Sequence, residues 1–200
     1  VAHSFATISI GGFSPHDASL GHFDSPLIWM IASAFMLIAA LNFALHFYTY
    51  SRLTLRHYSS DSESRFYFFY LFSAAVIVLA SLYLFGASET LDHSVYHAIL
   101  QTVSMATTTG FVTTEFHLWP AYLPMLLIFL SCVGGCGGST AGGIKAIRIM
   151  LVAKQGWREL QQLVHPNAVI PMKLKRRTLP NDVLSAVWSF IAIYGLTFMV

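Results

Sequence analysis

Charged residues are scarce in this chain: only 10% of its 200 residues are Asp, Glu, Lys or Arg, whereas a typical soluble domain has about 25%. Hydrophobic residues make up 56% of the chain and aromatic residues 14%. This shortage of charge excludes the ordinary soluble classes, because a soluble surface needs charged groups to remain in water. The composition therefore predicts an integral membrane protein.

Cysteines and clustered catalytic residues are also nearly absent. The only two cysteines, Cys132 and Cys136, lie in an apolar segment at a spacing that excludes a CxxC metal motif and a disulfide framework. Among the nine histidines, only His93 and His97 have helical i,i+4 spacing. With no third ligand nearby, they are better explained as the polar rim of a helix than as zinc ligands. Ser139 has no His or Asp within about 20 residues to act as its base. No group of residues supports an enzyme.

Basic residues are missing from several polar segments, and this asymmetry predicts the topology. All eleven Lys and Arg lie in the windows 52–65 and 145–177, which the positive-inside rule predicts to be cytoplasmic. The remaining polar segments contain no Lys or Arg. They hold acidic residues instead and are predicted to be external: Asp17, Asp24, Glu89, Asp92 and Glu115.

Long uncharged runs match this topology. Residues 26–50 and 66–86, about 25 and 21 residues long, could each cross a hydrocarbon core of about 30 Å as a helix. We expect the first to cross inward as one helix and the second to return. Residues 94–106 are also apolar, but about 13 residues of helix reach only about 20 Å, and both ends should be external. They are predicted to form the short helix of a re-entrant pore loop, with an extended return over residues 107–114.

A stretch rich in hydroxyl groups and glycine lies at the turning point of this loop. It consists of Thr107, Thr108, Thr109 and Gly110, and a fainter copy near the start of the chain consists of Ser9, Ile10, Gly11 and Gly12. Backbone at membrane depth must face water, protein or an ion, so both stretches are predicted to line a pore. An ordinary polar turn at the outer surface is the alternative for either copy alone.

The two copies can be aligned in two ways. One alignment pairs Ser4, Ala6 and Thr7 with residues 104, 106 and 107, and it leaves extra residues in the first copy. We prefer the gapless alignment, which pairs Gly12 with Gly110 and the Phe that follows each of them. In this alignment the first copy supplies fewer hydroxyl groups, so a strictly fourfold ion site is not expected.

Glycine dominates another stretch, which interrupts the apolar span that begins near Trp119. Its polar and glycine residues are Gly134, Gly135, Gly137, Gly138, Ser139, Thr140, Gly142 and Gly143. Because each glycine disfavours a helix by about 0.8–1 kcal/mol relative to alanine, the span is predicted to break near its middle. Close helix packing through small residues is an alternative. A phosphate-binding P-loop is excluded, since Ile144 separates Lys145 from the glycines and no Ser or Thr follows.

Together these motifs resemble the Trk/Ktr/HKT superfamily of potassium transporters. The similarity is carried by residues 106–111, by 134–143 and by the Ile-Lys-Ala-Ile-Arg sequence at 144–148. The family fold implies an all-α integral membrane protein with four helix–pore loop–helix repeats around a pseudo-fourfold axis. The chain then resembles a fragment of such a protein. Its parts would be the second pore loop and second inner helix (1–50), a cytoplasmic loop (51–65), a complete third repeat (66–153), a basic cytoplasmic loop (154–182) and the start of a fourth repeat (183–200).

The resemblance also implies a function, which is potassium uptake. Both four-residue stretches would belong to the selectivity filter, and the backbone carbonyls of Thr108, Thr109, Ile10 and Gly11 would bind the potassium ion by replacing its hydration shell. In this family a filter glycine is associated with potassium and a serine with sodium. The glycine-rich stretch 134–143 would be the gate. A transporter of another monovalent cation such as sodium and a neutral-solute channel are the alternatives, and symport with another ion is left open.

Potassium is the only ligand expected, and no covalent cofactor is implied. The expected surroundings are the lipid bilayer of the bacterial inner membrane, crossed several times by the chain. The resemblance implies two partners, a second copy in a homodimer and cytoplasmic nucleotide-binding regulatory subunits that are TrkA-like. No nucleic-acid partner is expected. The basic residues 173–177 would either anchor the chain near anionic lipid or contact the second copy or the regulatory subunits.

Overall fold

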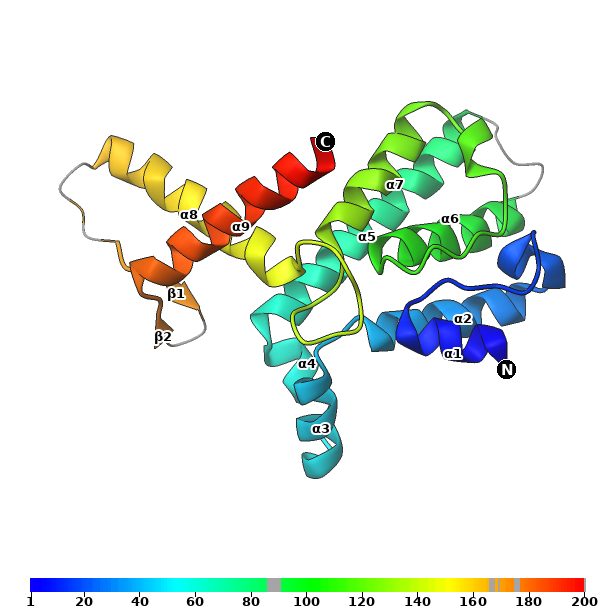
Figure 1. Cartoon of the computed structure of the whole chain (residues 1–200), viewed down its shortest axis with the longest axis horizontal. Helices are drawn as coiled ribbons and strands as arrows, with labels where there is room; N and C mark the ends of the chain where they lie inside the picture. The colour runs from blue at the N-terminus through cyan, green and yellow to red at the C-terminus, as the bar shows by residue number, and fades with distance from the viewer. Residues whose placement is uncertain (86–90, 166–167, 169, 175–176, 200) are drawn as a thin grey trace.

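The computed structural model describes residues 1–85, 91–165, 168, 170–174 and 177–199, and most of them are helical (Figure 1). The α-helices are α1 (Ala2–Ser9), α2 (Pro26–Ala39), α3 (Phe43–Arg52), α4 (Arg56–Ser60), α5 (Ser62–Leu84), α6 (Leu91–Ala106), α7 (Tyr122–Val133), α8 (Ala146–Val164) and α9 (Asn181–Met199). The 3-10 helices are η1 (Ser19–Phe23) and η2 (Phe116–Leu118), and the short strands β1 (Lys173–Leu174) and β2 (Arg177–Thr178) pair antiparallel. The predicted all-α class is confirmed.

Helix α5 forms the second predicted span as one continuous helix. It has 23 residues and, among the helices described, it alone is long and apolar enough to cross a membrane without a break. The helix begins where the Asp61 carboxylate accepts the Ser64 N–H at 2.9 Å, which satisfies one of its free N-terminal donors. Its side chains Phe69 and Phe72 are 73% and 71% exposed. Such an apolar outer face suits lipid or neighbouring helices. Gly86, the expected end of this span, lies outside the described residues.

The prediction of a single helix over residues 26–50 is wrong. Helix α2 ends at Ala39, α3 begins at Phe43, and the two helices are bent by 95°. Asn42 contributes to the break because its backbone is extended and its side chain accepts the Ala44 N–H at 2.9 Å, which starts a new helix. The apolar character of the run concealed this N-cap.

Backbone groups freed by this break are satisfied by a distant part of the chain. The Ala40 carbonyl accepts the Cys136 N–H at 2.9 Å, and the Phe43 N–H donates to the Gly138 carbonyl at 3.1 Å. Both partners belong to the glycine-rich stretch 134–143, hereafter the glycine-rich loop. Buried backbone groups must be paired, so the bend between α2 and α3 and the glycine-rich loop stabilise each other.

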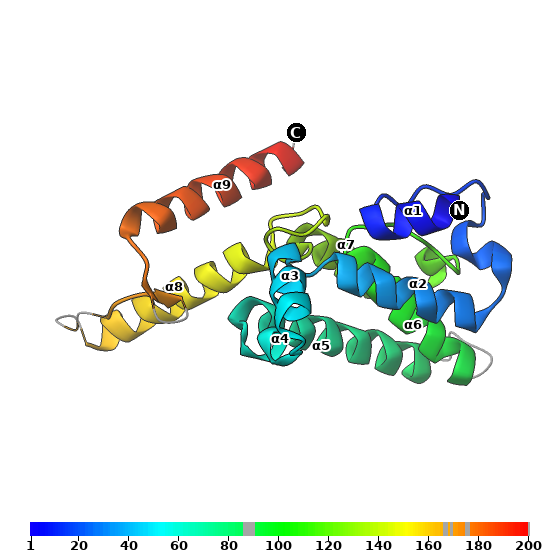
Figure 2. The same ribbon diagram turned by 90° about the horizontal axis from the view of Figure 1, so that it is seen from below.

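Helix α6 packs against α5, α7 and α2 (Figures 1 and 2). On one side it joins an apolar cluster that includes the buried Tyr67 and Leu127, and on the other side it joins a cluster around Trp29 and Phe111. Phe111 is fully buried. Because α6 is held on both sides, the position of its C-terminus and of residues 107–111 is determined by the surrounding core.

Helices α8 and α9 extend to one side of the other helices in both views (Figures 1 and 2). Helix α8 is continuous from Ala146 to Val164, which agrees with the expectation that Lys154 and Arg158 continue on a helical extension before the basic loop. The Arg148 guanidinium lies 4.0 Å from the centre of the Phe190 ring of α9, a cation–π contact between the two helices. Of the basic residues 173–177, Lys175 and Arg176 lie outside the described residues.

Candidate functional site

The residues after α6 form a tight loop whose backbone departs from the helix at once. Thr108 has φ 65° and Gly110 has φ 86°, both in the left-handed region. The Thr108 N–H donates to the Met105 carbonyl at 3.0 Å, and the Thr109 N–H donates to the Ser104 carbonyl at 2.8 Å. These bonds close the C-terminus of α6 and turn the chain back, as the re-entrant prediction requires.

Residues 9–12 repeat this geometry after α1. Ile10 has φ 56° and Gly12 has φ 67°. The Ile10 N–H donates to the Thr7 carbonyl at 3.4 Å, and the Gly11 N–H donates to the Ala6 carbonyl at 2.9 Å. Each dihedral and each bond has its counterpart in the other loop at the same sequence offset, with Ile10 matching Thr108 and Gly12 matching Gly110. The structure therefore supports the gapless alignment, and the sequence similarity of residues 9–12 to residues 107–110 reflects a shared backbone conformation.

The two loops lie against each other. A Cβ atom added to Gly12 would be 1.9 Å from the Thr109 carbonyl oxygen, so no larger residue fits there without moving the other loop. At Gly110 a Cβ would meet nothing within 4 Å, and glycine is favoured there by its positive φ alone. Gly12 is thus required by the close approach of the other loop, whereas Gly110 is required by its backbone angle alone.

Hydroxyl groups of the 107–110 loop are used mainly inside the protein. The Thr107 and Thr109 hydroxyl oxygens are 2.7 Å apart, and both side chains are buried. The Ser104 hydroxyl donates to the Phe111 carbonyl at 2.7 Å and ties the returning chain to α6. These bonds stabilise the loop and leave main-chain oxygens as the candidate ion ligands. No group of three or more His, Cys, Asp or Glu residues able to hold a metal is found in the part of the chain that the structure describes.

The glycine-rich loop interrupts one membrane-type span, as predicted. Helix α7 ends at Val133 and α8 begins at Ala146. Backbone bonds join the chain entering the loop to the chain leaving it: the Ile144 N–H donates to Cys132, Lys145 to Val133 and Ala146 to Gly135, all at 2.9 Å. The loop therefore protrudes from a closed neck, near the middle of the molecule in Figure 1. Because these residues are not helical, close helix packing does not explain them.

Glycine is needed at the neck because two backbone segments approach each other there. A Cβ on Gly134 would be 2.0 Å from the Gly142 carbonyl oxygen, and a Cβ on Gly143 would be 2.9 Å from the Cys132 carbonyl oxygen. Both glycines also have positive φ, 70° and 78°. The glycine content therefore correctly predicted a break in the span. The structural reason for the glycines is the close contact between two backbone segments at the neck.

The glycine-rich loop contacts the 107–110 loop and the end of α1 that leads into the 9–12 loop. Its Gly142 N–H donates to the Thr108 hydroxyl oxygen at 2.7 Å. Its Thr140 hydroxyl lies 3.2 Å from the Ile8 carbonyl oxygen, next to the 9–12 loop, and 3.3 Å from the Ala39 carbonyl oxygen. The structure thus brings together all three stretches selected from the sequence.

Two charged residues that the sequence did not assign to the site also hold this loop. Glu63, at the N-terminus of α5 and 8% exposed, accepts the Gly137 N–H at 2.5 Å. Lys145 donates from Nζ to the Ser139 carbonyl at 3.4 Å and to the Ala141 carbonyl. The only sequence signal for Glu63 was an acid inside a basic window, and Lys145 was noted as a basic residue after the glycines and as part of the 144–148 motif, without a role in holding the loop.

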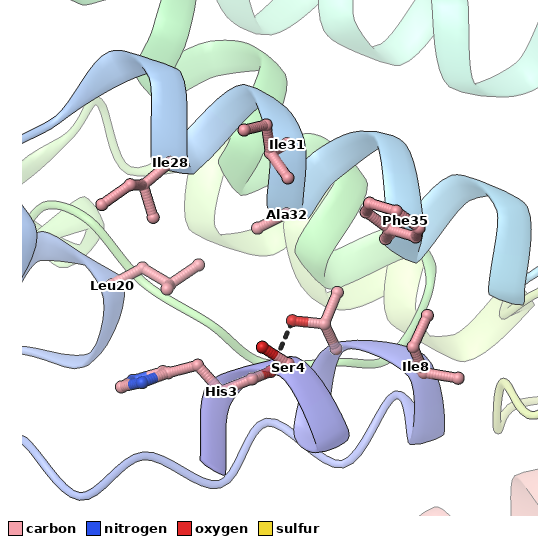
Figure 3. Close-up of a pocket in the computed structure, with 9 residues that line it drawn as sticks. His3, Ser4, Ile8, Leu20, Ile28, Ile31, Ala32 and Phe35 are labelled. Carbon is pink, nitrogen blue, oxygen red and sulfur yellow. Dashed lines mark hydrogen bonds between the residues drawn. The ribbon is translucent and has the colours of Figure 1, made fainter. Parts of the chain in front are cut away.

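An apolar pocket of about 350 Å³ lies between α1 and α2 (Figure 3). Ile28, Ile31 and Phe35 of α2 face His3 and Ile8 of α1 across it. Its walls are mostly hydrocarbon, so it lacks the ring of oxygens that a dehydrated cation needs. The candidate ion site is the pair of loops formed by residues 9–12 and 107–110.

The helices, the paired loops and the interrupted span are those of an all-α integral membrane protein. A family model described as "TrkH: Cation transport protein" matches residues 1–200. The chain belongs to the TrkH family.

Individual relatives agree with the family model. The chain is 48% identical over 198 residues to the Trk system potassium uptake protein TrkH of Halomonas elongata and 48% identical over 200 residues to that of Escherichia coli K12. It is 35% identical over 197 residues to TrkG of Escherichia coli K12. These alignments cover 98–100% of the chain and 40–41% of each relative.

A solved structure has the same fold. The crystal structure of the potassium transporter TrkH from Vibrio parahaemolyticus superposes with a TM-score of 0.96 at 45% sequence identity. The match covers 99% of this chain and 43% of that one. The chain thus spans about two fifths of the length of the TrkH proteins that it resembles.

Proposed function

We propose that this chain forms part of the ion path of a potassium uptake protein in the bacterial inner membrane. The observation that carries the proposal is the pair of loops with one backbone conformation, which a repeated filter requires. The relatives named as potassium uptake proteins support potassium as the ion. Glycine at both Gly12 and Gly110 is the residue that the family associates with potassium.

In this proposal, potassium is bound by backbone carbonyls of Thr108, Thr109, Ile10 and Gly11. Oxygen atoms at fixed positions replace the water lost by the ion, which lowers the cost of dehydration. The side chains of Thr107 and Thr109 already bond each other at 2.7 Å, so they hold the backbone in place. Two unequal loops give a site of less than fourfold symmetry.

The glycine-rich loop is the gate in this proposal. It is bonded to the 107–110 loop through Gly142 and to Ile8, just before the 9–12 loop, through Thr140, and its closed neck allows it to move as a unit without unfolding α7 or α8. A second copy of the protein and TrkA-like nucleotide-binding subunits on the cytoplasmic side are the proposed partners. The basic residues 173–177 are their proposed contact surface.

The test is the flux of rubidium and sodium into liposomes that hold the full-length polypeptide. Wild-type protein should conduct rubidium, and Gly110→Ser should lower the ratio of rubidium to sodium flux. Gly156→Ser is the matched control, because Gly156 also has open space around it but lies in α8 with no positive φ. An unchanged ratio in Gly110→Ser would refute the filter assignment, and flux of neutral solutes without rubidium would refute a cation path.

The gate is tested by deleting residues 137–141, which leaves the three bonds of the neck in place. Rubidium flux should rise, because the segment that obstructs the path is removed. A folded deletion variant with wild-type flux would show that the glycine-rich loop serves only packing.

A further inference from the structure

Lys145 breaks several local rules of helix formation at once. It is the N-cap of α8 with φ 82° and ψ 133°, and its side chain makes no capping bond to the helix. A non-glycine residue is strained at positive φ. Its positive charge also lies at the N-terminus of the helix, where the helix dipole disfavours cations. A residue placed against local preference in this way needs a compensating interaction.

That interaction is with the glycine-rich loop. The Lys145 ammonium donates to the carbonyls of Ser139 and Ala141. The backbone N–H of Lys145 donates to the Val133 carbonyl in the neck at 2.9 Å. An ammonium has three donors and no acceptor, so it suits two converging carbonyls. The backbone of Lys145 is thus fixed by the neck, and its side chain reaches back to the protruding part of the loop.

The two acceptors, Ser139 and Ala141, alternate along the loop with the two residues that contact the candidate filter region. Thr140, between them, reaches the Ile8 carbonyl, and Gly142, just after Ala141, donates to the Thr108 hydroxyl. A cation at Ser139 and Ala141 therefore stabilises the part of the loop that contacts Thr108 and the end of α1 just before the 9–12 loop. It also occupies two carbonyl oxygens and repels a second cation, because like charges at short range in a poorly solvated site oppose each other.

We propose that Lys145 is a positioning residue that latches the glycine-rich loop in its obstructing position. The ammonium bonds favour the latched position, while the backbone strain and the helix dipole at Lys145 oppose it. When the loop moves away, the bonds are lost and the strain can relax, so the latch is a two-state element that small forces can shift. This inference rests on the proposed gate function.

The test compares Lys145→Met and Lys145→Gly in the full-length polypeptide by rubidium flux into liposomes. Both variants lose the ammonium bonds, but only the glycine variant also relieves the strain. Hydrogen bonds to charged groups are strong enough that Lys145→Met should raise flux roughly ten-fold. Lys145→Gly should lie between Lys145→Met and wild type. The rubidium-to-sodium ratio should stay at the wild-type value, because the filter itself is unchanged.

Two controls separate the latch from a general effect of charge and from a role of Lys145 outside the loop. Lys154→Met removes the same charge at an exposed position of α8 and should leave flux unchanged; an equal rise would show a general charge effect and overturn the latch. In the variant lacking residues 137–141, both carbonyl acceptors are gone, so Lys145→Met should add nothing. A further rise there would mean that Lys145 acts elsewhere.

The outcomes distinguish this inference from the proposed function. Wild-type flux in both Lys145 variants, with raised flux in the deletion variant, overturns the latch and keeps the gate. Wild-type flux in the deletion variant overturns the gate itself. If Lys145→Met does not fold, Lys145→Gly decides, because glycine accepts the φ of this position without strain.

Discussion

The contact between Gly12 and Thr109 makes the two filter glycines unequal, and this can be tested by changing each to alanine. At Gly12 the new Cβ would lie 1.9 Å from the Thr109 carbonyl oxygen and 3.0 Å from its carbon. At Gly110 it would meet nothing within 4 Å. Both positions have positive φ, 67° and 86°, so the dihedral cost is common to both and the steric cost belongs to Gly12 alone.

The magnitude follows from these two terms. An L-residue in the left-handed region costs about 1–2 kcal/mol, and overpacking against a fixed neighbour adds about 1–3 kcal/mol. Gly110→Ala should therefore destabilise its loop by about 1–2 kcal/mol, and Gly12→Ala by about 2–5 kcal/mol. At Gly12 the strain must also displace the Thr109 carbonyl, which is a proposed potassium ligand of the other loop.

The assay is rubidium and sodium flux in liposomes, with folding checked by thermal unfolding of the purified full-length protein. Gly12→Ala should lose most rubidium flux and discriminate poorly between the ions, because one substitution distorts two loops. Gly110→Ala should keep measurable flux with a smaller change in the ion ratio. Equal effects of the two variants, or wild-type selectivity in Gly12→Ala, would refute the reasoning that the two loops share one rigid contact.

Two further predictions concern the bonds that hold the glycine-rich loop. Thr108→Val removes the acceptor of the Gly142 N–H and should favour loop movement by about 1 kcal/mol, seen as about five-fold higher rubidium flux; Thr108→Ser keeps the hydroxyl and should match wild type. Glu63→Ala leaves the Gly137 N–H without its carboxylate and should raise flux about ten-fold or more, since bonds to charged groups contribute about 1.5–3 kcal/mol. Glu63→Gln keeps an acceptor and should show a smaller rise; equal flux in both Glu63 variants and wild type would contradict a role for this bond.

Much of the fold could be predicted from local patterns. The uncharged run 66–86 indicated the long helix α5, and the shortness of 94–106 indicated that α6 must enter and return. The glycine content of 134–143 indicated a break between α7 and α8. Each of these rests on length, apolar character or intrinsic helix preference, which are properties of adjacent residues and need no knowledge of the rest of the chain.

The bend between α2 and α3 could not be predicted in the same way. The run 26–50 is apolar and long enough to span, and Asn42 is a weak signal by itself. The break is stable because the Ala40 carbonyl and the Phe43 N–H find partners in Cys136 and Gly138. Without that distant loop, the freed backbone groups would favour a continuous helix.

The residues around the glycine-rich loop also separate into features that the local sequence predicts and features that depend on distant contacts. The sequence alone determined that two similar loops and one interrupted span exist, because hydroxyl groups, glycines and charge-free lengths are visible without a structure. Only the tertiary structure decided that Gly12 touches Thr109, that Gly142 bonds to Thr108, and that Glu63 and Lys145 hold the loop. These contacts join residues far apart in the chain or depend on a single strained backbone angle. Packing of the whole molecule determines both the distant contacts and the strained backbone angle, and no local sequence pattern encodes them.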